Sequence, residues 1–324
     1  MKAVLLALAA LLLPLPALAQ VSVQSVQSPA PALGTVSSAN SGATVFRVSP
    51  SSGSVTRLSG SGTRIGGGST RPLVTLACGT DPDCVTRDVV VTVSSLGAPS
   101  GRMGQLDNFT VSALTAVITG SPSGTDPMTF TIAPIGLSGV ATFYLGMDVP
   151  VLGNDSAEAT GAASATFQIS AAFSGGGAAD TQGGAATATV FRPLSIAATT
   201  NLFFGALIRP DIGSGTVTLD AVTGNRALVN VGAIGPAPAR ARFVVSGEGG
   251  QGFSVSMPES FDMTGPGAPL TVTLQSDAIG PMALDGGLGS SGSKDIMIGG
   301  YFAISSTTAI GSYSGNFEVT VAYN

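Results

Sequence analysis

The stretch from Gly311 to Asn324 alternates between apolar and polar side chains, and this pattern constrains the fold more than any other feature of the chain. Successive side chains of a β-strand point to opposite faces, so a period of two indicates a strand with one apolar face. An aromatic strand of this kind either packs into a sheet of its own chain or pairs with a partner. The residues on the apolar side are Tyr313, Phe317, Val319, Val321 and Tyr323.

The composition extends this expectation to the rest of the chain. The 324 residues include 45 glycines and 20 prolines, only 10% of them are charged, and the mean hydropathy is +0.44. Disordered chains combine high charge with low hydropathy, which is not the case here. Short runs rich in valine and threonine, such as Val89–Val93, alternate with Gly, Pro, Asn and Asp turn signals, and no convincing amphipathic helix is present. The pattern predicts an all-β fold.

The second half of the chain repeats the first. Each half offers about seven short strands, the number typical of an immunoglobulin-like sandwich of two antiparallel sheets. Because the matches occur in the same order, they predict two tandem sandwich domains, residues 20–173 and 185–324, joined by a flexible Gly/Ala-rich linker at 174–184. The matching pairs are Leu33-Gly34 with Phe204-Gly205, Phe109–Ser112 with Phe253–Ser256, Met128–Ile132 with Leu270–Leu274, and Phe167–Phe173 with Phe317–Tyr323.

Residues 1–19 have the pattern of a secretory signal peptide. A positive start precedes an apolar run from Ala3 to Leu15, and Ala17-Leu18-Ala19 before Gln20 fits a small-x-small cleavage site. A transmembrane anchor is the alternative, but the run is shorter than the ~20 apolar residues that a membrane span needs. We therefore expect an exported, soluble product.

The chain contains two cysteines, Cys78 and Cys84. In an exported protein, two cysteines this close are expected to form a short-loop disulfide, and the Asp81-Pro82 pair between them is a turn signal. A metal site is the alternative, but it would need more thiolate or imidazole ligands than this chain provides. The sequence predicts a Cys78–Cys84 bridge and no metal.

The residue types needed for most catalytic sites are missing. Histidine is absent, which excludes Ser-His-Asp and Cys-His nucleophilic catalysis. The acidic residues mostly stand singly beside Gly, Pro or Asn, as turn-capping residues do. The net charge is −5 without a basic run, so nucleic acid and an anionic membrane surface are poor partner candidates. We expect no enzymatic activity and no cofactor.

Two stretches of the second half carry a resemblance to a known family. Residues Ala185–Ile196 with Leu202–Gly205, and the terminal Gly311–Tyr323, resemble an uncharacterised family of exported bacterial β-domains. That family is in turn similar to the spore coat protein U-like fimbrial subunits of chaperone–usher pili. The first half departs from the pattern, with Leu33-Gly34 for Phe-Gly and Ala163 in place of Tyr313.

The resemblance implies an incomplete sandwich, in which a groove beside the last strand accepts a donor strand. The first donor strand would come from a periplasmic chaperone and the second from a neighbouring subunit, each by β-augmentation. An outer-membrane usher would be a further partner. Our hypothesis is that the middle strand closes a domain within the chain, while the N-terminal segment or the terminal groove serves assembly. The candidate donors are Val21, Val23 and Val26 at the N-terminus and Ala186, Ala188 and Val190 in the middle.

The sequence thus predicts a structural subunit or tip adhesin of a fimbria or pilus. Its partners would be filament subunits, itself included, and it would pass through the periplasm to the cell surface. A secreted, non-enzymatic binding module for carbohydrate or matrix is the alternative. The absence of tryptophan and the presence of only four tyrosines disfavour sugar stacking.

Overall fold

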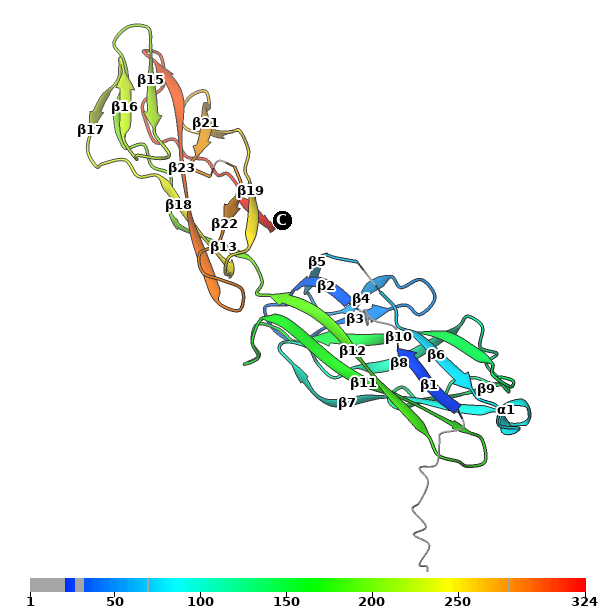
Figure 1. Ribbon diagram of the computed structural model, residues 1–324. Coiled ribbons are helices and arrows are strands. Elements are labelled where there is room, and N and C mark those ends of the chain that lie inside the picture. Colours follow the sequence, from blue (N-terminus) through cyan, green and yellow to red (C-terminus); the bar gives the residue numbers. More distant parts are fainter. Residues whose placement is uncertain (1–20, 27–31, 69, 279) are drawn as a thin grey trace, which may run out of the picture.

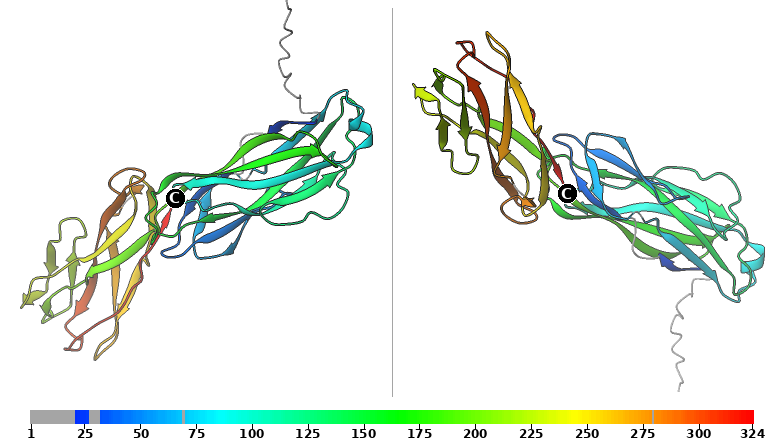
Figure 2. Two further views of the ribbon diagram at one scale, coloured as in Figure 1. Left: turned by 90° about the horizontal axis from the view of Figure 1, so that it is seen from below. Right: turned by 90° about the horizontal axis from the view of Figure 1, so that it is seen from above.

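A computed structural model describes residues 21–26, 32–68, 70–278 and 280–324. The expected signal peptide, residues 1–19, lies outside these ranges. The described chain is almost entirely β-structure, with one short helix, as the sequence predicts. None of its helices is long and apolar enough to cross a membrane. Figures 1 and 2 show an elongated molecule in which two groups of sheets are joined end to end.

The apolar side chains form two separate buried clusters, and we call the parts of the chain around them the first unit and the second unit. In the first unit, two six-stranded sheets pack face to face over their cluster, in the orders β1-β6-β10-β3-β4 (with β8 beside β10) and β5-β2-β12-β11-β7-β9. The strands are β1 (Val21–Val26), β2 (Ala32–Ser37), β3 (Thr44–Val48), β4 (Val55–Ser59), β5 (Thr63–Gly66), β6 (Leu73–Cys78), β7 (Val89–Ser100), β8 (Asp107–Ala113), β9 (Met128–Ile132), β10 (Val140–Val151), β11 (Gly161–Phe173) and β12 (Asp180–Phe191), with helix α1 (Asp83–Thr86) before β7.

The second unit contains one large sheet and two small ones. The large sheet has the order β13-β18-β23-β15-β16, with β21 beside β23 and β20 beside β21; the small ones are β14-β17 and β22-β19-β24. Its strands are β13 (Ser195–Thr200), β14 (Ala206–Ile208), β15 (Ser214–Leu219), β16 (Arg226–Val229), β17 (Gly232–Ile234), β18 (Ala241–Glu248), β19 (Gly252–Ser256), β20 (Ser260–Met263), β21 (Leu270–Ser276), β22 (Met282–Ala283), β23 (Ser291–Ser305) and β24 (Thr320–Tyr323).

The two units share one plan of strand pairing. Eight strand pairs of the first unit recur in the second, between strands that follow the same order along the chain. The corresponding pairs are β1·β6 and β13·β18, β2·β5 and β14·β17, β3·β4 and β15·β16, β3·β10 and β15·β23, β6·β10 and β18·β23, β8·β10 and β21·β23, β7·β11 and β19·β24, and β7·β9 and β19·β22. Two first-unit pairs have no counterpart, and both contain β12. Among the described strands, the second unit in turn has one pair without a counterpart, β20·β21, so the two pairing schemes differ by β12 and β20.

This correspondence corrects part of the predicted repeat. The match of β11 with β24 and the match around Gly34 and Gly205 agree with the pairing. The other two matches are wrong, because β19 takes the place of β7 rather than β8, and β21 that of β8 rather than β9. Short alternating segments are interchangeable by sequence, and only their pairing partners distinguish them.

The predicted linker is also wrong as a flexible connector. Residues 180–184 belong to β12, which pairs antiparallel with β11, so 174–179 are the turn of a long hairpin. The whole of β12 lies in the first unit, although residues 185–191 were expected in the second domain. The chain crosses between the units at residues 192–194, just before β13. Glycine and alanine fit strands whose neighbours approach closely: a Cβ on Gly184 would lie 2.4 Å from Cζ of Phe167.

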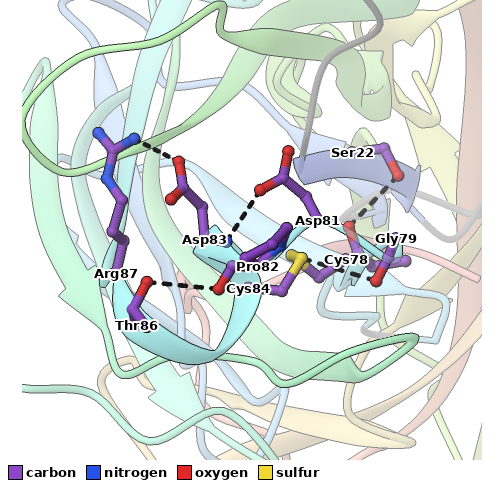
Figure 3. Close-up of a disulfide and its surroundings, with 10 residues drawn as sticks. Ser22, Cys78, Gly79, Asp81, Pro82, Asp83, Cys84, Thr86 and Arg87 are labelled. Atoms are coloured by element: carbon purple, nitrogen blue, oxygen red, sulfur yellow. Dashed lines mark hydrogen bonds and ion pairs between the residues drawn. A yellow bond between two sulfur atoms is a disulfide. The ribbon is translucent and has the colours of Figure 1, made fainter.

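The predicted disulfide between Cys78 and Cys84 is present (Figure 3). It joins the end of β6 to helix α1, and both cysteines are buried. In the intervening turn, the carboxylate of Asp81 accepts a hydrogen bond from the backbone N–H of Asp83 at 2.8 Å. Arg87 then pairs with Asp83 at 2.6 Å, four residues later. The bridge fixes the end of the first unit that lies farthest from the second (Figure 1).

Candidate functional site: an open sheet edge in the second unit

In the first unit, β12 joins two strands that would otherwise both be edges. It pairs antiparallel with β11 and parallel with β2, completing the order β5-β2-β12-β11-β7-β9. The equivalent strands of the second unit stand as β17-β14 and β24-β19-β22. Among the described residues, no strand joins β14 to β24. One added strand between them would give the same six-stranded order, and we call this position the strand slot.

The backbone of β24 presents hydrogen-bonding groups to the strand slot. The N–H of Asn324 donates to the carbonyl of Gly252 on β19 at 3.1 Å. Hydrogen-bonded and non-hydrogen-bonded pairs alternate along antiparallel strands. The backbone groups of Tyr323 and Val321 therefore face away from β19, toward the slot. An unpaired row of this kind is a template for another strand.

The cores of the two units differ as an open slot requires. The first cluster contains 35 buried apolar residues with 5 partly buried ones packed against it. The second cluster contains 15 buried residues with 17 partly buried ones. Among the described residues, more than half of the second core is therefore accessible at its margin, and four of the five predicted assembly residues belong to the accessible part.

The predicted terminal strand forms only in part. Burial alternates as the sequence predicts: Val319 is buried, while Tyr313, Phe317, Val321 and Tyr323 are half-buried, and all residues between them are exposed. Regular pairing, however, is restricted to β24 at residues 320–323, and residues 311–319 make one isolated bridge. Alternating side chains are not sufficient for a ladder of strand-to-strand hydrogen bonds. Such a ladder also needs backbone partners on a neighbouring strand.

Aromatic contacts hold the irregular stretch against the second unit. The ring of Phe317 packs against Phe261 at 5.2 Å and Phe243 at 6.2 Å between centroids. The hydroxyl of Tyr313 donates a hydrogen bond to the carbonyl of Ala309 at 3.1 Å. These rings cover the end of the core next to β20 and β18.

Tyr323 connects β24 to the junction between the units. Its hydroxyl accepts a hydrogen bond from the N–H of Glu248 at 2.7 Å and donates one to the carbonyl of Arg192 at 2.9 Å. Its ring packs against Phe191, the last residue of β12, at 5.5 Å. Burial, which disfavours the phenolate, raises the pKa of Tyr323 above its ordinary value.

A buried ion pair lies under this tyrosine. The carboxylate of Glu248 is fully buried and pairs with Arg192 at 2.9 Å. It also accepts hydrogen bonds from the N–H of Arg192 at 3.1 Å, the hydroxyl of Thr160 at 3.1 Å and the N–H of Gly289. Thr160 precedes β11 in the first unit, so this cluster joins both units to the chain segment between them. The sequence signal for this cluster is weak, because Gly247-Glu248-Gly249 has the composition of a turn.

The candidate donor residues all lie inside the first unit. Val21 and Val23 of β1 are buried in its core, and Val26 is partly buried against it. The N–H of Val23 donates to the carboxylate of Asp180 at 2.7 Å, and β1 pairs along its length with β6. In this conformation β1 is therefore already paired and packed within the first unit. The middle candidates are the buried residues of β12: Ala186, Ala188 and Val190.

No group of three or more metal-ligating side chains gathers within the described ranges. The strand slot is bordered by the backbone edges of β14 and β24 and by apolar side chains of the second cluster. Sequence reasoning missed its other border, β14, because a three-residue strand is too short for a period to be visible.

Comparisons with known proteins give one family model that matches within the second unit and whose description assigns no role. A family described as "Domain of unknown function (DUF4402)" matches residues 194–323. No curated protein matches the chain. A solved structure reported under the words "Chaperone-tip adhesin complex is vital for synergistic activation of CFA/I fimbriae biogenesis" is similar with 9% sequence identity and a TM-score of 0.25, over 93% of this chain and 98% of that chain.

Proposed function

We propose that this protein is a subunit of an extracellular cell-surface filament, joined to its neighbour by a β-strand that enters the strand slot. The observation that carries the proposal is the comparison of the two units: β12 joins β2 to β11 in the first unit, whereas no described strand joins their equivalents, β14 and β24, in the second. In the first unit, β12 occupies the position that corresponds to the strand slot. It is therefore an example, within this chain, of how a strand fills that position.

The energetics favour an occupant. Strand addition satisfies the outward backbone groups of β24 and β14, and alternate side chains of the added strand cover the accessible core. Fully burying one large apolar side chain is worth roughly 1.5–3 kcal/mol. Several of the 17 partly buried residues of the second unit would gain part of this on strand entry. A periplasmic chaperone, acting with an outer-membrane usher, is the expected first donor, and a filament subunit the second.

The proposal assigns the chain to an end of the filament. A subunit within a shaft accepts one strand and donates another. Here Val21 and Val23 of the N-terminal strand β1 are buried in the first unit, so β1 is not offered to a neighbour. The chain accepts a strand without donating this one, which favours a tip adhesin with the first unit outermost.

Electron microscopy of surface material, with mass spectrometry of the purified filaments, tests the proposal. The informative variant is Val321→Asp, which places a charge on the core-facing side of β24, beside the position of the added strand, and the matched control is Thr320→Asp, the exposed neighbour on the opposite face. We expect the wild type and Thr320→Asp in filaments and Val321→Asp only as folded monomer, as judged by circular dichroism. Finding the wild type only as a free monomer, or both variants equally in filaments, would contradict the proposal.

A further inference from the structure

A second candidate site lies at the junction of the two units, apart from the strand slot. A cleft of about 490 Å³ opens there, lined by residues of both units and of the segment between them. Its size falls in the range of small-molecule sites, which occur preferentially between domains. We propose that this cleft binds a neutral saccharide.

The wall from the second unit is a row of hydroxyl groups. Ser195, Ser246 and Ser293 are direct partners across the neighbouring strands β13, β18 and β23. Directly opposed residues project to the same face, with strands spaced about 4.8 Å apart, so the row extends over about 10 Å. The carboxylate of Asp285 stands beside it in the lining of the cleft.

The wall from the first unit consists of two asparagine side chains, Asn40 and Asn154. Their loops are fastened together, because the N–H of Asn154 donates to the carbonyl of Ala39 at 2.8 Å. Within the described residues, neither amide side chain, nor the carboxylate of Asp285, has a hydrogen-bond partner. These groups are donors and acceptors available to a ligand.

The charges of the cleft favour a neutral ligand over an anion. Arg192 lies at its border, but the guanidinium pairs with the buried carboxylate of Glu248 at 2.9 Å. The unpaired charge in the lining is then that of Asp285. Amides, hydroxyls and one carboxylate are the groups that hydrogen-bond sugar hydroxyls, whereas a mainly apolar ligand would leave them unpaired.

The buried cluster beneath the cleft holds the two walls in place. Glu248 accepts hydrogen bonds from Thr160 of the first unit and from Arg192 of the connecting segment, and Arg192 donates to Thr160 at 2.6 Å. A site whose walls are already fixed loses less entropy on binding a ligand. Without an aromatic wall, the affinity should be in the millimolar range typical of a few hydrogen bonds.

Saturation-transfer NMR of the full chain with neutral mono- and disaccharides at about 10 mM, a concentration suited to millimolar affinity, tests this site. Ser246→Val and Asn154→Ala remove one group from each wall, and Thr216→Val, an exposed position on β15, is the matched control. We expect binding of at least one neutral saccharide, weakened about tenfold in both wall variants and unchanged in the control.

Three results would overturn the inference. They are the absence of binding by every neutral saccharide, binding that both wall variants retain, and a preference for sialylated or sulfated sugars. None of these results depends on strand entry, so the inference can fail while the filament proposal stands, and the reverse also holds.

Discussion

The hydroxyl of Tyr323 donates a hydrogen bond to the backbone carbonyl of Arg192 at 2.9 Å, so the strand that borders the slot is fastened to the segment between the units. The same hydroxyl accepts from the N–H of Glu248 on β18. One side chain therefore connects β24, the large sheet of the second unit and the junction. A strand entering beside β24 would pair next to this connection.

The first prediction concerns this tyrosine. Tyr323→Phe removes both hydrogen bonds and leaves the N–H of Glu248 without its partner, so we expect a loss of about 1–3 kcal/mol in the free energy of unfolding. Chemical denaturation measures it. Tyr301→Phe, on an exposed side chain of β23, is the control and should be within about 0.5 kcal/mol of wild type. Equal stability of the two variants would remove the structural role assigned to the hydroxyl.

The second prediction concerns the buried ion pair. Glu248→Gln removes a fully buried carboxylate that is the counter-charge of the half-buried Arg192 guanidinium, and we expect a loss of about 3 kcal/mol. Asp295→Asn breaks the exposed Arg242–Asp295 pair and should cost no more than about 0.5 kcal/mol. Denaturant titrations of both variants give the comparison. A cost for Glu248→Gln as small as that of the control would contradict the interpretation of the cluster as a structural lock.

The third prediction concerns alkaline pH. The pKa of the Tyr323 phenol is raised in the folded state, chiefly by burial. Between the ordinary tyrosine pKa of about 10 and the raised value, the folded state therefore binds more protons than the unfolded state. The free energy of unfolding should fall as the pH rises through this window, and the contribution is fully present below it.

Melting temperatures between about pH 8 and about pH 11.5, a range that brackets the ordinary tyrosine pKa of about 10, give the measurement. The wild type should lose stability more steeply above pH 10 than Tyr323→Phe, which has no phenol to ionise. Parallel curves for the two proteins would show that the folded state does not disfavour the phenolate at this position.

The sequence was sufficient for the class of fold and insufficient for the pairing. Hydrophobic alternation predicts which side of the terminal stretch is buried, and Val319 and Phe317 lie as expected. Alternation does not specify a neighbour, so it could not reveal that residues 311–319 lack a regular ladder or that β12 pairs with β11. Glu248 is a further case, because an acid between two glycines has the composition of an exposed turn.

The fourth prediction concerns the disulfide. Replacing both Cys78 and Cys84 by serine opens a loop of sequence separation 6, and we expect a loss of about 2 kcal/mol from the greater entropy of the unfolded chain. Both serine hydroxyls would occupy buried positions, which adds to this cost. Thermal unfolding of the wild type with and without a reducing agent gives an independent value. Agreement of the reduced and oxidised melting temperatures would contradict the prediction.

The last prediction completes the second unit with a strand of the first. Phe173 and Tyr323 occupy equivalent positions, so a copy of residues 175–191 appended after Asn324 reproduces the turn and β12 in the order found after β11. We expect the copy to enter the strand slot and to protect the outward amides of Val321 and Tyr323 from hydrogen exchange. The melting temperature should rise by several degrees, the shift that a gain of about 1 kcal/mol in the free energy of unfolding produces. The control carries aspartate at the three copied positions that correspond to Ala186, Ala188 and Val190, because charges there would face the core. If both extended chains exchange at β24 as the wild type does, the strand slot does not accept a strand, and the proposed assembly mechanism fails with it.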